Sequence, residues 1–209
     1  MKFAALISLA LMVASPAYGK AVKPIQPLPA NIIGVNHIVE TRVTLNDATR
    51  ANFDKLEAKA AEKREAAKLP VAPKTFAPGE RPKPDDYATL PIAQMFPLML
   101  EDISKQWGMT AGKSIRIDVE FDTLKTANAG AAILFGSNDQ LAGVVSVVDA
   151  DSGQKIGEYY VDVLNQRSGL LGLALRGSGV REKLAAEFSK RLAQTLTGSK
   201  SKPKEKPAS

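Results

Sequence analysis

The sequence predicts an α+β domain in which an antiparallel sheet of about four to five strands is covered on one face by two amphipathic helices. Three observations support this fold class. Residues 114–124 alternate between apolar and charged side chains, which is typical of a strand with one buried face. Residues 92–107 and 180–196 each repeat apolar side chains at helical spacing, so each predicted helix has an apolar stripe that can pack on the sheet.

The first predicted strand covers residues 35–45, where apolar and polar residues alternate with period two. The residues on its apolar side are Val35, His37, Val39, Thr41, Val43 and Leu45. We therefore expect this side to face the core or an interface.

Three further segments predict the rest of the sheet. Residues 141–149 are apolar on both faces, as in a central strand. The turn residues at 151–153 lead into residues 156–164, which we expect to form the hairpin partner. The short apolar segment 129–136 is one more candidate strand.

A third helix is predicted over residues 48–68, with Asn46 or Asp47 as its N-cap. It is rich in Ala, Lys and Glu, and few large apolar residues line it, so we expect it to be exposed and lightly packed. Residues 70–91 contain six prolines and predict a linker of polyproline character.

The first residues predict export. Lys2 precedes an apolar run over residues 4–14, and small residues follow up to Gly19, which is the pattern of a cleavable signal peptide. The expected organisation is a signal peptide at 1–19, a strand and exposed helix at 20–69, the linker at 70–91, a compact domain at 92–197 and a disordered basic tail at 198–209. The expected location is the periplasm, without a transmembrane span.

Composition excludes several classes of protein. The chain has no cysteine, which excludes disulfides, thiolate metal sites and a lipid-anchored cysteine. The net charge is +6, yet residues 91–197 hold eleven Lys and Arg against twelve Asp and Glu. The basic excess lies at the ends of the chain, so no nucleic-acid-binding groove is predicted.

Residues 114–196 carry a resemblance. The segments 144–149, 151–153, 169–179 and 182–196 resemble uncharacterised exported bacterial α+β proteins, many of them lipoproteins, which are distantly similar to the amino-terminal domain of TolB and to the curli protein CsgG. The resemblance implies a role in the cell envelope without enzymatic activity.

Motifs for catalysis or cofactors are weak. Residues 108–114 look like a phosphate-binding loop, but one residue is missing between the glycines and the segment joins a helix to a strand in the wrong order. His37 is the only histidine, and no nucleophile elbow accompanies it. Residues 149–153 are too short for a calcium loop and predict a hairpin turn. No cofactor, metal or catalytic residue is predicted.

Two candidate sites remain, and both lie before the last helix. Backbone amides at the helix start, with two arginines nearby, could bind an anion; the residues are Arg176, Gly177, Ser178, Gly179 and Arg181. A leucine-rich loop could either fill the core or contact a partner; its leucines are Leu170, Leu171, Leu173 and Leu175.

We therefore expect a non-enzymatic envelope protein that binds another envelope component, whose identity the sequence does not reveal. Two alternatives stay open at this point. One is a periplasmic enzyme of hydrolase type, and the other is a domain that binds a small ligand.

Overall fold

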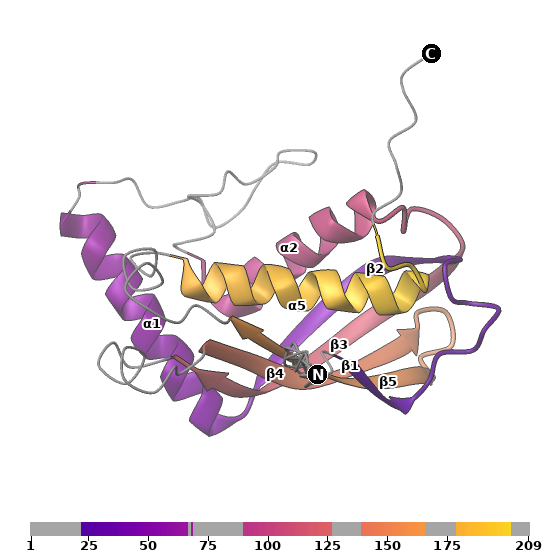
Figure 1. Ribbon diagram of the computed structural model, residues 1–209, viewed down its shortest axis with the longest axis horizontal. Helices are drawn as coiled ribbons and strands as arrows, with labels where there is room; N and C mark the ends of the chain where they lie inside the picture. The colour runs from indigo at the N-terminus through magenta and orange to yellow at the C-terminus, as the bar shows by residue number, and fades with distance from the viewer. Residues whose placement is uncertain (1–21, 67, 69–89, 127–138, 166–178, 202–209) are drawn as a thin grey trace, which may run out of the picture.

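The computed structural model describes residues 22–66, 68, 90–126, 139–165 and 179–201 (Figure 1). The elements in chain order are β1 Val22–Gln26, β2 Asn36–Leu45, α1 Asp47–Ala66, α2 Ile92–Gln106, β3 Lys113–Lys125, β4 Asp139–Asp149, β5 Lys155–Asn165 and α5 Val180–Thr197. The predicted α+β class is confirmed. The expected signal peptide, the candidate strand at 129–136 and the end of the basic tail lie outside the described residues.

The five strands form one sheet in the order β1-β5-β4-β3-β2. The pairs β1–β5, β5–β4 and β4–β3 are antiparallel, but β2 runs parallel to β3. The prediction of a purely antiparallel sheet is therefore wrong at this edge, and the sheet is mixed. The cause is the connection between β2 and β3, because a crossover that contains helices returns the chain to the end of the sheet where β2 began.

Both edge strands come from residues 22–45, which the sequence analysis placed ahead of the compact domain. β1 pairs with β5 and was expected only to be extended, because two prolines stand within and just after it. Prolines are tolerated in edge strands, where the missing N–H needs no partner. In the structure the sheet extends across the expected boundary between the two segments.

β2 contains a bulge that reverses its alternation. Its register with β3 shifts between Ile38 and Glu40, so that Val39 is the extra residue. Ile38 packs against the core while Val39 is 53% exposed. The predicted inward position of Val39 is therefore wrong, although Val43 and Leu45, beyond the bulge, do pack on the core.

α1 is lightly packed, as its composition predicted. Of the two candidate caps, Asn46 fills the role, because its Oδ1 accepts a hydrogen bond from the Thr49 N–H at 2.9 Å. Phe53 is the one large apolar side chain of the helix that is fully buried among the described residues. Most of the other described side chains of α1 are exposed.

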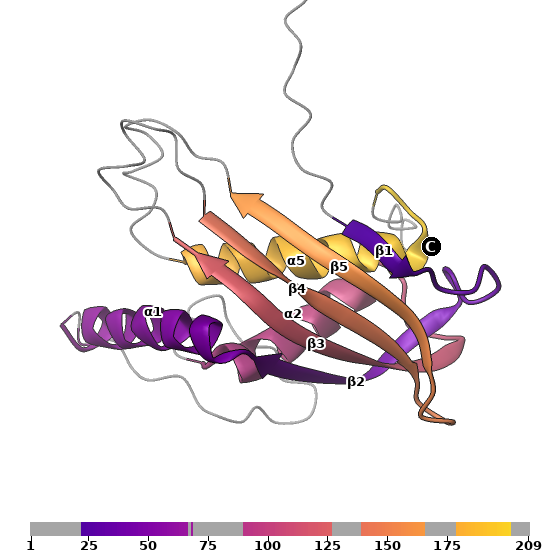
Figure 2. The same ribbon diagram turned by 90° about the horizontal axis from the view of Figure 1, so that it is seen from below.

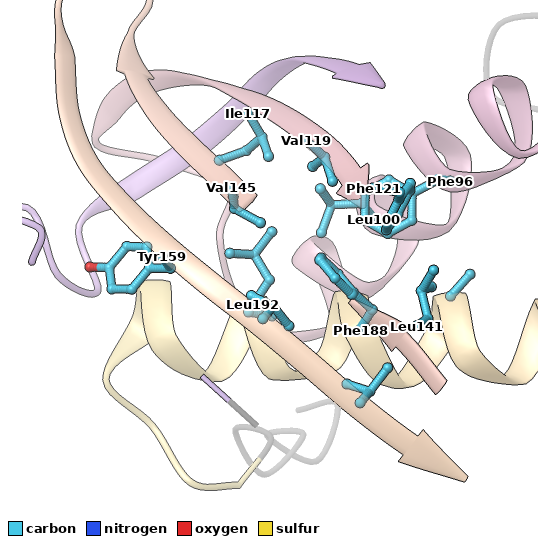
Figure 3. Close-up of a cluster of buried hydrophobic side chains, with 14 of the residues drawn as sticks. Phe96, Leu100, Ile117, Val119, Phe121, Leu141, Val145, Tyr159, Phe188 and Leu192 are labelled. Atoms are coloured by element: carbon cyan, nitrogen blue, oxygen red, sulfur yellow. The ribbon is translucent and has the colours of Figure 1, made fainter. Parts of the chain in front are cut away.

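The core lies between the sheet and the apolar faces of α2 and α5 (Figure 3). Its centre is aromatic: the ring of Phe121 on β3 lies 5.1 Å from Phe96 on α2 and 5.1 Å from Phe188 on α5, with the rings close to perpendicular. Phe53 approaches the same ring at 6.0 Å. Edge-to-face contacts of this kind are favourable and bring all three helices onto one strand.

The opposite face of the sheet carries no helix in the described parts of the chain (Figure 2). Val148, near the end of β4, is nevertheless only 4% exposed. Charged side chains on the flanking strands surround this central strand, and they are paired: Arg116 with Asp118 at 2.9 Å, and Lys155 with Glu158 at 2.6 Å. Long charged side chains can cover apolar neighbours while their ends stay in water.

Candidate functional site at the edge of the sheet

The two edges of the sheet differ in their capacity to accept another strand. An edge strand has unpaired N–H and C=O groups along one side, which can pair with a further chain. β1 is only five residues long and contains Pro24 and a register shift next to Ile25. β2 is ten residues long and has no proline. The open edge of β2 is thus the better template for pairing.

A groove of about 400 Å³ runs between the edge of β2 and α2. We call it the β2 groove. Its strand wall consists of residues 37–41, and its helix wall includes Pro97, Leu98, Glu101 and Lys105. Thr110, which forms a bridge with His37, stands at one end. The groove therefore joins an open strand edge to the side of a helix, a combination that suits an extended polypeptide.

The β2 groove contains exposed apolar surface. Val39 is more than half exposed because of the bulge, and Ile38 and Leu98 are partly buried beside it. The other exposed large apolar side chains among the described residues also lie at or near strand edges and ends; they are Ile25, Ile33, Val35 and Leu164. Exposed apolar groups at an edge favour contact with another molecule.

An acidic and a basic side chain form an ion pair on β2, at and just beyond the strand wall of the groove, and a second such pair lies on the helix wall. On β2, Glu40 Oε1 lies 2.7 Å from Arg42 Nε, and both side chains are about half exposed. On α2, Glu101 and Lys105 form a pair one helical turn apart, also about half exposed. Such exposed pairs stabilise the fold little, about 0–1 kcal/mol each.

His37 lies at the end of the groove, half-buried, between the carbonyl of Gly112 and the hydroxyl of Ser114. The ring Nδ1 is 3.1 Å from Gly112 O, and Nε2 is 3.4 Å from Ser114 Oγ. If Nδ1 carries the proton it donates to the carbonyl, which leaves Nε2 as an acceptor. The contact to the serine is longer than the range of about 2.6–3.2 Å for a catalytic hydrogen bond. The pair is best read as a cross-strand polar contact that orients the ring.

The two sites predicted from sequence fall mostly outside the described residues. This applies to the four leucines of the 169–175 loop and to residues 176–178 of the anion site. Two members of that site are described. Gly179 starts α5 with φ of 79°, and Arg181 is buried at 5% exposure. Both sites stay predictions.

Arg181 belongs to a group of charges that joins three helices. Its guanidinium donates to Glu57 of α1 at 3.0 Å and to its neighbour Glu182 at 2.8 Å. The same Glu57 carboxylate accepts the N–H of Ile92, the first residue of α2, at 2.9 Å. The carboxylate therefore satisfies a backbone donor that a helix start leaves without an intrahelical partner. In the described residues the guanidinium thus already faces two carboxylates.

The segment that looked like a phosphate-binding loop joins α2 to β3, as its order in the sequence indicated. Its Lys113 does not point to a vacant loop: the ammonium contacts Asp149 at 2.9 Å and Asp151 at 2.8 Å. The two carboxylates belong to the turn between β4 and β5, which confirms the predicted hairpin. No group of three or more metal-ligating side chains occurs among the residues that the structure describes.

Sequence reasoning missed the β2 groove because it assumed uninterrupted alternation in β2. One signal was available: Ile38, an apolar residue, stands on the polar side of an otherwise regular pattern. A large apolar residue out of phase in a strand is what a bulge produces. The position of α2 beside this edge, by contrast, has no sequence signal.

The comparisons with known proteins concern the fold. No protein-family model matches the chain, and no curated protein matches it. The PelC dodecamer of Paraburkholderia phytofirmans is similar over 86% of this chain and 98% of its own, with 8% identity and a TM-score of 0.40. The DUF330 protein XCC0632 of Xanthomonas campestris covers 83% and 91%, with 11% identity and a TM-score of 0.44.

A third similar structure is a suspected lipoprotein from Caulobacter crescentus CB15. The similarity covers 49% of this chain and 81% of the lipoprotein chain, with 11% identity and a TM-score of 0.33. At these values the likeness carries no argument about function. The resemblance to TolB and CsgG stays a prediction. None of the described helices is long and apolar enough to cross a membrane.

Proposed function

We propose that this chain is an exported, non-enzymatic protein of the cell envelope that binds another envelope protein at the β2 groove. The predicted signal peptide supports the location. The observation that carries the binding proposal is a ten-residue edge strand that is bridged to Thr110 only at His37 among the described residues and lies beside a groove with exposed apolar surface. The ligand class is a polypeptide, because the N–H and C=O groups of an extended strand match those of the open edge.

Strand addition also fits a groove in which few polar side chains converge on one point. Main-chain hydrogen bonds to β2 would supply affinity, and side chains at alternate positions would fit against Val39 and Leu98 for specificity. The groove presents few polar groups that converge on one point, which a small-ligand site would need.

Site-specific photocrosslinking tests the proposal in cells that express the chain naturally. A photoreactive residue replaces Val39 in the groove, and a matched one replaces Leu164, which is also exposed at 39% but lies on β5 at the far end of the sheet. We expect position 39, and not 164, to crosslink to one envelope polypeptide that mass spectrometry can identify. Crosslinking at neither position, or only at 164, would contradict binding at this groove.

A further inference from the structure

The charges along the open edge of β2 are arranged symmetrically about Thr41. Glu40 and Arg42 flank it and lie on the same face of the strand, where they are opposite Arg116 and Asp118 of β3. We infer that the β2 groove receives the β2 strand of a second copy of this chain, antiparallel to the first and related to it by a two-fold axis at Thr41. This inference rests on the proposed function and identifies its polypeptide partner.

The two-fold axis makes the edge self-complementary on its charged face. In an antiparallel pair centred on Thr41, Glu40 lies opposite Arg42 of the second copy, and Arg42 lies opposite Glu40 of the second copy. Opposite charges directly across two strands are favourable, and like charges are unfavourable. Each monomer already holds these two side chains 2.7 Å apart at the surface. Pairing therefore converts two separate ion pairs into one network of four charges.

The bulge at Val39 makes the apolar face match as well. A bulge places two residues of one strand opposite a single residue of its neighbour. With Val39 as the extra residue, Ile38 lies opposite Val43 of the second copy, and both point toward the helix side of the sheet. These side chains are only partly buried in the single chain, so pairing removes more of their apolar surface from water.

The helix wall repeats the same arrangement of charges. An axis perpendicular to the sheet at Thr41 brings α2 of both copies to the same face, and the two helices run in opposite directions. Glu101 and Lys105 stand along the groove on each α2. Each copy therefore brings one acidic and one basic side chain to this face of the pair.

Other occupants fit less well. The edge of β1 carries Pro24, which cannot donate to a ladder. The chain's own segment 69–89 contains five prolines and is a poor partner for a strand edge for the same reason. A foreign strand would need to carry an acidic and a basic residue two positions apart in matching order, a condition that this chain meets by symmetry.

Charge reversal tests the inference with the full mature chain. Glu40→Arg places Arg opposite Arg, and Arg42→Glu places Glu opposite Glu, so each single variant should dimerise at least about tenfold more weakly than wild type. An equimolar mixture of the two variants should restore dimerisation, because all four charges then attract. The double variant Glu40→Arg with Arg42→Glu should dimerise like wild type. Sedimentation equilibrium measures the dissociation constants, and circular dichroism checks that each variant folds.

The outcomes separate this inference from the proposed function. A wild-type chain that stays monomeric up to about 0.1 mM, or single variants that dimerise as tightly as wild type, would overturn pairing through β2. If the chain is monomeric while position 39 still crosslinks to a different envelope polypeptide, only the inference that the partner is a second copy of this chain is wrong. If position 39 crosslinks only to a second copy of this chain and dimerisation responds to charge reversal as described, the binding of a different envelope protein is wrong and self-pairing stands.

Discussion

Single side chains hold the turn between β4 and β5. Asp149 Oδ1 accepts the N–H of Asp151 at 2.9 Å and also receives the ammonium of Lys113 at 2.9 Å. The hydrogen bond from Lys113, with smaller contributions from the backbone N–H groups of the turn, lowers the pKa of Asp149 below its ordinary value. Lys113 in turn has a raised pKa, chiefly through its hydrogen bonds to Asp151 and Asp149.

Replacement of Asp149 by Asn should therefore change how the free energy of unfolding depends on pH in the acid range. Because the folded pKa of Asp149 is depressed, its charge stabilises the fold above the unfolded pKa of about 4 and ceases to do so as the pH falls through the lower folded value. We expect Asp149→Asn to be less stable than wild type at pH 7, with a gap that narrows below about pH 4. Urea unfolding across pH measures this. Asp54→Asn on the exposed side of α1 is the control, and an equal pH response from both variants would refute the argument.

Residue-level prediction from the sequence was uneven for a physical reason. The side chains of β3 alternate without interruption, so Ile117, Val119 and Phe121 could be assigned to the core, and they are fully buried. Val39 could not be placed, because a bulge depends on how two strands pair and not on the strand alone. The strand wall of the β2 groove therefore escaped detection, because Val39, its exposed apolar residue, was assigned to the inward side of the strand.

At the scale of elements, two side chains of α1 join it to the core and to the covering helices, and Asn52 also donates to the Leu124 carbonyl of β3 at 3.1 Å. Phe53 inserts beside the aromatic rings of the core, and Glu57 bonds to Arg181 and to the first N–H of α2. The rest of the helix is polar and gains little from burial. Glu57 thus connects the helix that precedes the linker to both helices that cover the sheet.

Loss of the Glu57 carboxylate should loosen this connection. In Glu57→Ala the Ile92 N–H loses its acceptor and Arg181 loses one of its carboxylates, so we expect a loss of about 1–3 kcal/mol in unfolding free energy. Amide hydrogen exchange should accelerate at Ile92 in particular. Glu62→Ala, on the exposed surface of the same helix, is the matched control and should change neither quantity. Unchanged exchange at Ile92 in Glu57→Ala would show that this amide does not depend on the carboxylate.

The sequence located most elements and misjudged one relation between them. Apolar periodicity marked α2, α5, β3 and the β4–β5 hairpin, since each is set by residues near one another in the chain. The direction of β2 depends on the path of the connection through α1 and α2, which no local pattern encodes. β1 was missed as a strand because its prolines are typical of loops, although an edge position tolerates them.

At the scale of the whole molecule, the described fold ends with α5. Gly198 follows the helix with φ of 67°, and Gln194 bonds to the carbonyl of Lys200 at 3.2 Å. Leu192 and Leu196 of the same helix are fully buried in the core. Among the described residues, these contacts hold the end of the domain in place.

Removal of residues 202–209 should leave the stability of the domain unchanged. This segment contains three lysines, two prolines and no large aliphatic or aromatic residue, so it has little with which to pack. We expect the Tm of a chain that ends at Ser201 to equal that of the full mature chain within error. The same truncation in a dimerisation assay should also have no effect. A fall of several degrees in Tm would mean that the tail contacts the domain.

The mixed sheet has a consequence for the time course of folding. β1 and β2 are synthesised first, but their neighbours come much later: Val22 pairs with Val161, and Asn36 pairs with Lys113. Contacts between residues so distant in the chain form slowly, whereas the β3–β4–β5 meander is local. Both edge strands must therefore wait for partners while the chain is incomplete. Proline keeps β1 from pairing with a wrong chain in that interval, so β2 is the strand of a nascent molecule that most needs to be shielded.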